Sequence, residues 1–178
     1  MEKNLATIAE RAFERWGDNW NFRAYLRKNV EPAMLDATVH RLNDSVSAQI
    51  DCTTCGNCCR EVHPHLIPSD VTRLAQHLQI PDAALAEKHL SPDEYGEHVF
   101  NRKPCPMLCG NRCTVYEARP TDCRGYPHLH QPDFLARSIM VIENYRVCPI
   151  IFNVYEALKE EFAYDPAVDY IGDEEQEP

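Results

Sequence analysis

The feature that most constrains this chain is a dense run of cysteines. Four of its nine cysteines fall between Cys52 and Cys59, in the spacing C-x2-C-x2-C-C. A turn that carries thiols at this density can direct several sulfurs to one point, and thiolates are soft ligands that select zinc, copper(I) or iron–sulfur clusters over hard cations. We therefore expect this run to supply half of a metal site and the later cysteines to supply the other half: Cys105, Cys109, Cys113, Cys123 and Cys148.

Length and charge argue against several other kinds of protein. The chain has 178 residues, which fits one domain with a modest core, and its net charge of −10 argues against a nucleic-acid-binding surface. The sequence holds no apolar run of about 18 residues, so we expect no membrane span. The first residues lack the apolar region of a secretory signal, so we expect a cytoplasmic, reducing compartment, where an odd number of cysteines favours metal ligation over disulfides.

Hydrophobic spacing predicts a mainly α-helical fold with irregular, metal-nucleated loops and little β-structure: a small single domain with an N-terminal helical extension. Residues 1–50 carry no cysteine, and their apolar side chains recur at helical spacing in three stretches, the third beginning at Pro32. We expect this amphipathic extension to cover the cysteine domain or to meet a protein partner. Residues 51–150 are expected to form the cysteine-cluster domain, and residues 151–178 a helix and an acidic tail.

Other elements follow from the same patterns. We expect Ser69 to cap a helix from Asp70 to Gln79, and residues 91–103 to be mostly loop. Residues 136–145 are the best candidate for a strand, and a helix is expected from Asn153 to Phe162. The tail from residue 165 carries six acidic residues and no basic one, which predicts a solvated end.

Cysteine spacing alone leaves two kinds of metal site open. The run Cys52-x2-Cys55-x2-Cys58 is of the bacterial-ferredoxin type, in which a remote Cys-Pro supplies a fourth ligand, and both Cys105 and Cys148 precede proline. Alternatively, the first two cysteines form a thiolate knuckle in which a glycine allows a tight turn, and a second pair completes a tetrahedral zinc site.

The adjacent Cys58 and Cys59 add a constraint. Neighbouring side chains of an extended backbone point in opposite directions, so we do not expect both thiols to bind one mononuclear ion. Two four-ligand sites would use eight of the nine thiols, which favours two such sites or one polynuclear cluster. Nearby guanidinium groups would offset the thiolate charge: Arg60, Arg112, Arg119 and Arg124.

Histidine ligands are the remaining alternative. Imidazole suits zinc and iron, and four histidines lie beside the cysteines, although enough thiolates exist without them: His63, His65, His128 and His130. No phosphate-binding glycine loop, dinucleotide fingerprint or local nucleophile–base arrangement is present, so the sequence identifies no catalytic residue.

With these residues in place, the chain resembles the YkgJ-type cysteine-cluster family, the zinc- or iron-chelating CxxCxxCC proteins. The shared motifs run from Cys52 to Cys148: Cys52-x2-Cys55-Gly56-x-Cys58-Cys59, Ile67-x2-Asp70-x2-Arg73-Leu74, Cys105-Pro106-x-Leu108, Cys113-x2-Tyr116-Glu117-x-Arg119-Pro120-x2-Cys123-Arg124-x-Tyr126-Pro127, and Cys148. The resemblance leaves Cys109 outside the pattern and implies these metal ligands: Cys52, Cys55, Cys58, Cys59, Cys105, Cys113, Cys123 and Cys148. The family is also similar to the cysteine-rich part of flagellin lysine methylases, which implies an iron–sulfur centre.

The sequence therefore predicts a metal-binding protein whose cysteine cluster has a structural or redox role. A [4Fe–4S] cluster is the favoured cofactor, with zinc as the alternative. Two further hypotheses stay open: a redox or modifying enzyme, or its accessory subunit, whose cluster takes part in chemistry, and a metal-delivery or protein-interaction module.

Overall fold

The structure is a computed structural model that describes residues 1–170, and it divides into two compact units. The helical unit consists of residues 1–50 together with the chain from residue 127 onward, and the cysteine unit consists of residues 51–126. Residues 127–150 group by their contacts with the helical unit, and the cysteine-cluster domain expected at residues 51–150 stays a prediction. No helix within residues 1–170 combines the length and the apolar character that a membrane span requires.

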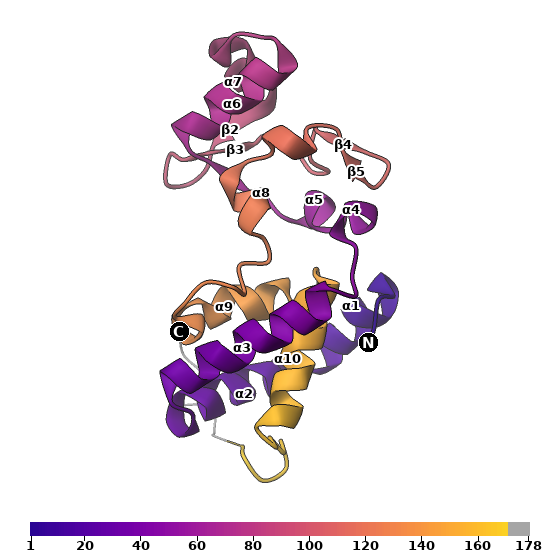
Figure 1. Cartoon of the computed structure of the whole chain (residues 1–178), viewed down its shortest axis with the longest axis vertical. Helices are drawn as coiled ribbons and strands as arrows, with labels where there is room; N and C mark the ends of the chain where they lie inside the picture. Colours follow the sequence, from indigo (N-terminus) through magenta and orange to yellow (C-terminus); the bar gives the residue numbers. More distant parts are fainter. Residues whose placement is uncertain (171–178) are drawn as a thin grey trace. The chain divides into compact units, whose positions relative to one another are not determined.

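Five helices build the helical unit (Figure 1): α1 (Leu5–Glu14), α2 (Trp16–Asn29), α3 (Pro32–Ser47), α9 (Phe134–Asn144) and α10 (Pro149–Glu161). The three predicted N-terminal helices are confirmed. The Asn4 side chain accepts hydrogen bonds from the backbone N–H groups of Ala6 and Thr7 at the start of α1. Pro32 occupies the first turn of α3, where its missing N–H group costs nothing.

The core of the helical unit forms where α10 packs against α3 and α1. Phe22 of α2 is fully buried, and its ring meets Tyr155 of α10 edge-on, with 5.3 Å between centroids. The buried Tyr155 hydroxyl donates to the backbone carbonyl of Asn19, 3.0 Å away, so its polar end is satisfied. The Lys159 ammonium donates to Asp18 Oδ2 at 2.5 Å, which adds an ion pair between α10 and α2.

The predicted strand at residues 136–145 is wrong, because this segment is helix α9. Its buried residues include Phe134, Ser138, Val141 and Ile142, which recur with the period of a helix. The strand was predicted because this segment contains several β-branched residues, which favour strands. The C-terminal helix is confirmed but starts earlier than predicted, at Pro149. The predicted solvated tail extends into residues 171–178, which lie outside the described residues.

The cysteine unit alternates short helices with very short strands: α4 (Cys52–Cys55), α5 (Cys58–Glu61), β1 (His65–Leu66), α6 (Pro68–Leu78), α7 (Asp82–His89), β2 (Leu90–Pro92), β3 (His98–Phe100), β4 (Leu108–Cys109), β5 (Arg112–Cys113), the 3-10 helix η1 (Tyr116–Ala118) and α8 (Thr121–Gly125). Strands β1, β3 and β2 form one antiparallel sheet in that order, and β4 pairs with β5 in another. The mainly helical fold class with little sheet is confirmed.

Two details of the cysteine unit differ from expectation. Residues 91–103, predicted as mostly loop, contain all of β3 and the last two residues of β2. Strand β3 forms because it pairs on both sides, including with the distant β1. Helix α6 begins at Pro68 rather than after a Ser69 cap, which places Asp70 at its third position. A small apolar core, to which Leu74 and Phe100 belong, packs against α6 and the sheet.

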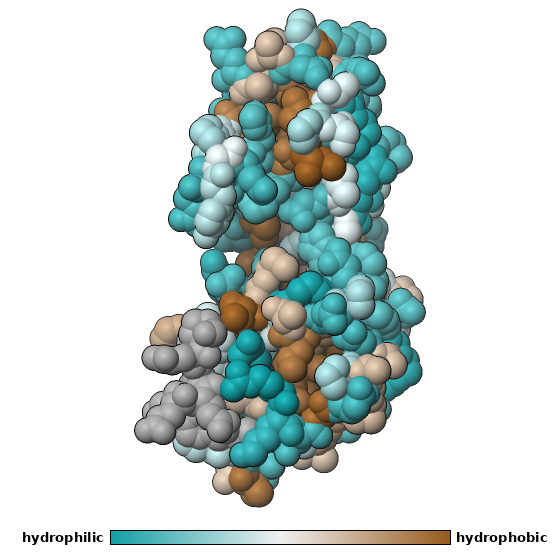
Figure 2. Space-filling view, turned by 90° about the vertical axis from the view of Figure 1, so that its left-hand side faces the viewer, coloured by the Kyte–Doolittle hydropathy of each residue, from teal (hydrophilic) through white to brown (hydrophobic). Residues whose placement is uncertain are grey.

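Apolar side chains at the surface are mostly scattered. On the face drawn in Figure 2, hydrophilic side chains (teal) cover most of the surface, and apolar ones (brown) gather in small patches. Phe13 of α1 is 87% exposed, whereas Phe22 of α2 is 0% exposed. The two phenylalanines therefore offer a matched pair for measuring how much the helical core contributes to stability.

We expect Phe22→Ala to lower the free energy of unfolding by about 3–5 kcal/mol, because it leaves a cavity among the rings of α2 and α10. Phe13→Ala should change it by no more than about 0.5 kcal/mol, because that side chain is already in water. Urea unfolding followed by circular dichroism measures both values. Equal losses in the two variants would contradict the packing described.

Candidate metal centre

The first cysteine turn is built from two single-turn helices separated by a glycine. The Asp51 carboxylate accepts from the backbone N–H of Thr53 at 2.9 Å and so caps α4. Gly56 ends α4 with a φ of +63°, a conformation that favours glycine, and α5 starts two residues later. The turn leaves Cys52 exposed and half-buries the other three thiols, those of Cys55, Cys58 and Cys59.

A second constraint acts on Gly56. A Cβ atom at this position would lie 2.7 Å from the backbone oxygen of Asn111, which follows β4. The Arg60 side chain stabilises this close contact between the two turns. Its Nη1 donates to the carbonyl of Gly56 at 2.9 Å. Its Nη2 donates to the carbonyl of Gly110 at 2.8 Å and to Asn111 Oδ1 at 2.6 Å. The arginine side chain therefore joins the first cysteine turn to the β4–β5 hairpin through backbone and amide oxygens.

The later cysteines are placed by the backbone around this hairpin. The N–H of Cys105 donates to the carbonyl of Cys59 at 2.7 Å, which ties the two cysteine segments directly. In the hairpin, Cys113 pairs with Leu108 and Cys109 pairs with Arg112. Because neighbouring residues of a strand face opposite sides, Cys113 and Cys109 lie on opposite faces. Cys113 packs against the apolar core, and Cys109 is exposed.

Cys123 is positioned by a buried carboxylate. Asp70 is 1% exposed and accepts from the Thr121 N–H at 3.1 Å and from its hydroxyl at 2.8 Å, at the start of α8. Arg73 donates both to Asp70 and to the carbonyl of Arg119, 2.9 Å away. This network holds α8 against α6 and thereby fixes the position of Cys123. It gives a structural role to motif residues that carry no thiol.

Four thiols from separate segments form one group, which we call the inner thiol group: Cys59, Cys105, Cys113 and Cys123. Every pair among them interacts electrostatically. Burial, followed by the charges of the other members, raises the pKa of the Cys105 thiol to about 11 and that of Cys123 further. Several partly buried thiols that lie close together provide the soft ligands that thiophilic metals require.

Cys59 differs from the other three members. A hydrogen bond from the Cys58 thiol, together with the charge of Arg60, outweighs burial and lowers the pKa of Cys59 to about 7. The prediction that Cys58 and Cys59 point in opposite directions is wrong, because the backbone here is helical rather than extended. Their two sulfurs adjoin, so Cys58 lies next to the inner thiol group.

The spacing of the sulfurs bears on the kind of metal. Among residues 1–170, no three cysteine sulfurs all lie within 4.8 Å of one another. A tetrahedral zinc ion with Zn–S bonds near 2.3 Å requires sulfurs about 3.8 Å apart. A polynuclear cluster binds each thiolate through a different metal ion and holds the sulfurs farther apart. The donor set fits both zinc and iron.

The other predicted ligands are divided between the units. Cys52 and Cys55 lie together on α4. The Cys52 residue is exposed as a whole, but partial desolvation of its thiol and then the neighbouring Cys55 charge raise the pKa of Cys52. Cys148 belongs to the helical unit, where it is buried directly before the first residue of α10. Seven of the eight predicted ligands thus lie in the cysteine unit, together with Cys109. A ligand role for Cys148 stays a prediction.

The histidines of the cysteine unit have another environment. The His65 ring lies between two carboxylates, with Nε2 at 3.2 Å from Asp93 and Nδ1 at 3.4 Å from Glu97. These contacts join β1 to the turn between β2 and β3. His128 and His130 belong to the helical unit. We therefore assign no histidine to the inner thiol group, which consists of four cysteines.

Sequence reasoning missed the residues that close the site. The tripeptide Cys-Gly-Asn occurs twice, at residues 55–57 and 109–111, and both glycines have nearly the same φ, +63° and +61°. This repetition was the signal for two similar turns that meet. The Asp70–Thr121 contact has no comparable signal, because the two residues are separated by 51 positions.

A family model matches residues 51–149, a range that contains all nine cysteines. Its description is "CxxCxxCC: Putative zinc- or iron-chelating domain". No curated protein matches the chain, and no solved structure matches it. The family resemblance expected from the motifs is confirmed.

Gly56→Ala should destabilise the metal-loaded protein more than Gly110→Ala does. Both substitutions force alanine into a positive φ, at a cost of about 1 kcal/mol. Only at Gly56 does the new Cβ meet a backbone atom, so we expect a further loss of at least about 1 kcal/mol and less bound metal per chain. Urea unfolding and elemental analysis measure these effects. Equal losses would show that the approach of Asn111 is not required.

Asp70→Asn should lower the free energy of unfolding by about 2–3 kcal/mol at neutral pH, because the buried ionic hydrogen bonds weaken. Burial alone raises the pKa of Asp70, but hydrogen bonds from Thr121 and Arg73 outweigh it and hold the pKa below the ordinary 3.8. The contribution is therefore complete above pH 3.8 and is lost as the pH falls below that value. Stability curves against pH test this. Glu87→Gln, at an exposed carboxylate of α7, is the control and should lose much less stability than Asp70→Asn.

Proposed function

Because the chain belongs to the CxxCxxCC family of zinc- or iron-chelating cysteine-cluster domains, we propose that the cysteine unit holds its metal through the inner thiol group. The observation that carries the proposal is the convergence of four separate segments. The Cys105 N–H donates to the Cys59 carbonyl at 2.7 Å, and Cys105 and Cys113 pack against one apolar core. Cys123 lies close enough to Cys59, Cys105 and Cys113 for their charges to raise its pKa. Cys52, Cys55 and Cys58 are further thiolates of the same unit and extend the donor set toward the eight-thiol pattern expected from the sequence.

An iron–sulfur cluster is the favoured cofactor. The ferredoxin-like spacing of the first three cysteines supports it. Four thiolates around a [4Fe–4S]²⁺ core carry a net charge of about −2, which the nearby Arg60 partly offsets. When bound, such a cluster supplies one-electron transfer. Zinc in the same thiolates would supply a structural link only.

The metal is also proposed to complete the fold. The cysteine unit has a small apolar core, and its strands are two or three residues long. Metal–thiolate bonds would join α5, the segment at Cys105, β5 and α8, whose thiolates would otherwise repel one another. Loss of the metal should therefore loosen these segments together. Thiolate ligands of this kind persist in a reducing compartment, so we propose a cytoplasmic location.

The partner expected at the N-terminal helices stays a prediction. Phe13 and Trp16 are the most exposed large apolar side chains of α1 and α2, at 87% and 48%. They mark the place at which substitutions would test such a partner.

The decisive experiment is elemental and sulfide analysis of protein purified without oxygen. We expect iron and acid-labile sulfide at about four of each per cluster, and we expect Cys123→Ser to lose most of both. Cys109→Ser is the control, because that thiol is exposed on the opposite face of the hairpin and should keep the metal. Zinc in place of iron would retain the thiolate site and reject the cluster. Unchanged metal in Cys123→Ser would contradict the proposed site.

A further inference from the structure

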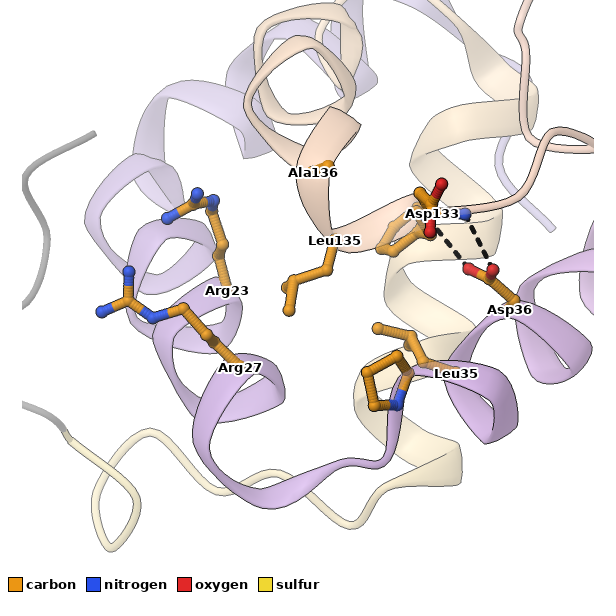
Figure 3. A pocket seen from close by; sticks show the side chains of 9 residues that line it. Arg23, Arg27, Leu35, Asp36, Asp133, Leu135 and Ala136 are labelled. Atoms are coloured by element: carbon orange, nitrogen blue, oxygen red, sulfur yellow. Dashed lines mark hydrogen bonds between the residues drawn. The ribbon is translucent and has the colours of Figure 1, made fainter.

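The helical unit contains a cavity of about 430 Å³ that the metal centre does not explain. Side chains of α2, of the first two turns of α3 and of the start of α9 line it. In Figure 3, Arg23 and Arg27 lie on one side, Asp36 and Asp133 lie on the opposite side, and apolar side chains lie between them. The volume falls within the range typical of small-ligand sites.

The two arginines form a preorganised cationic wall. Arg23 is 9% exposed, and its Nε donates to the buried Ser138 hydroxyl at 2.9 Å, which fixes the guanidinium group. Arg27 lies one helical turn later and is exposed at the cavity rim. The two charges are close enough to interact, since burial and then the charge of Arg27 lower the pKa of Arg23. Like charges at this spacing destabilise a helix unless an anion offsets them.

Carboxylates of the cavity do not supply that anion. The Asp36 oxygens accept from the backbone N–H groups of Asp133 at 2.8 Å and Phe134 at 2.9 Å, so Asp36 caps α9. Within residues 1–170, neither Arg23 nor Arg27 forms an ion pair. Apart from the Arg23 Nε–H, which is bonded to Ser138, the guanidinium N–H groups of this wall have no carboxylate acceptor among residues 1–170.

The middle of the cavity is apolar. Leu35 of α3 is buried, Leu135 of α9 is half-buried, and Pro32 and Ala136 complete the lining. A ligand that fills this space must therefore bring an apolar body as well as a negative charge.

We propose that this cavity binds a small amphipathic carboxylate. Its carboxylate accepts hydrogen bonds from Arg23 and Arg27, as the planar guanidinium group favours, and its apolar body packs between Leu35 and Leu135. The site lies wholly in the helical unit and does not depend on the proposed metal chemistry. Binding would tie α2 to α3 and α9, so it should raise the melting temperature of the helical unit.

Calorimetric titration of the full metal-loaded chain with octanoate tests the proposal, with 1-octanol as a neutral probe of similar apolar length. We expect saturable binding of one octanoate per chain and at least tenfold weaker binding of octanol. Arg27→Gln should weaken octanoate binding about tenfold and leave octanol binding unchanged. Lys28→Gln is the matched control, because it removes the same charge from the next residue of α2, which does not line the cavity.

Arg27 is exposed, so its substitution should preserve the fold, and circular dichroism checks this. Leu135→Trp, which fills the apolar part, should abolish binding of both probes. The proposal is overturned if octanoate does not saturate, if octanol binds equally well, or if Arg27→Gln and Lys28→Gln weaken octanoate equally.

Discussion

The geometry of the cysteine unit depends on the contact between the turn at Gly56 and the turn of the β4–β5 hairpin. Arg60 joins the two turns by donating to the carbonyls of Gly56 and Gly110 and to the side-chain oxygen of Asn111. The approach is close enough that Gly56 has no room for a side chain. With the turns held in this way, the backbone bond from Cys105 to Cys59 becomes possible, and the hairpin turns Cys113 inward. Hydrogen bonds to oxygens, rather than to sulfur, thus set the geometry of the thiols.

The second support of the site is electrostatic. Asp70 has almost no contact with water, yet it stays ionised because Thr121 and Arg73 surround it with donors. The Asp70 carboxylate accepts a hydrogen bond from Thr121, the first residue of α8, and α8 contains Cys123. The buried Asp70 carboxylate therefore fixes the position of Cys123, although the two residues are far apart in the sequence. Cys123 is thus positioned before any metal binds.

The sequence predicted the helical class, the N-terminal helices and the family, because these depend on local periodicity and on cysteine spacing. It failed at residues 136–145, where β-branched residues obscured a helical period, and at β2 and β3, which depend on pairing with β1. The sequence identified the candidate thiol ligands but did not indicate which of them form the inner thiol group. The grouping follows from Asn111 and Asp70, whose contacts span about 50 residues and leave no trace in any short window.

The helical unit is assembled from both ends of the described chain, with the whole cysteine unit between them. Helices α1, α2 and α3 precede residues 51–126 in the chain, and α10, which packs against α3 and α1, follows them. Packing of α10 against α3 therefore closes a loop that contains residues 51–126, and folding of the cysteine unit lowers the entropy cost of closing that loop.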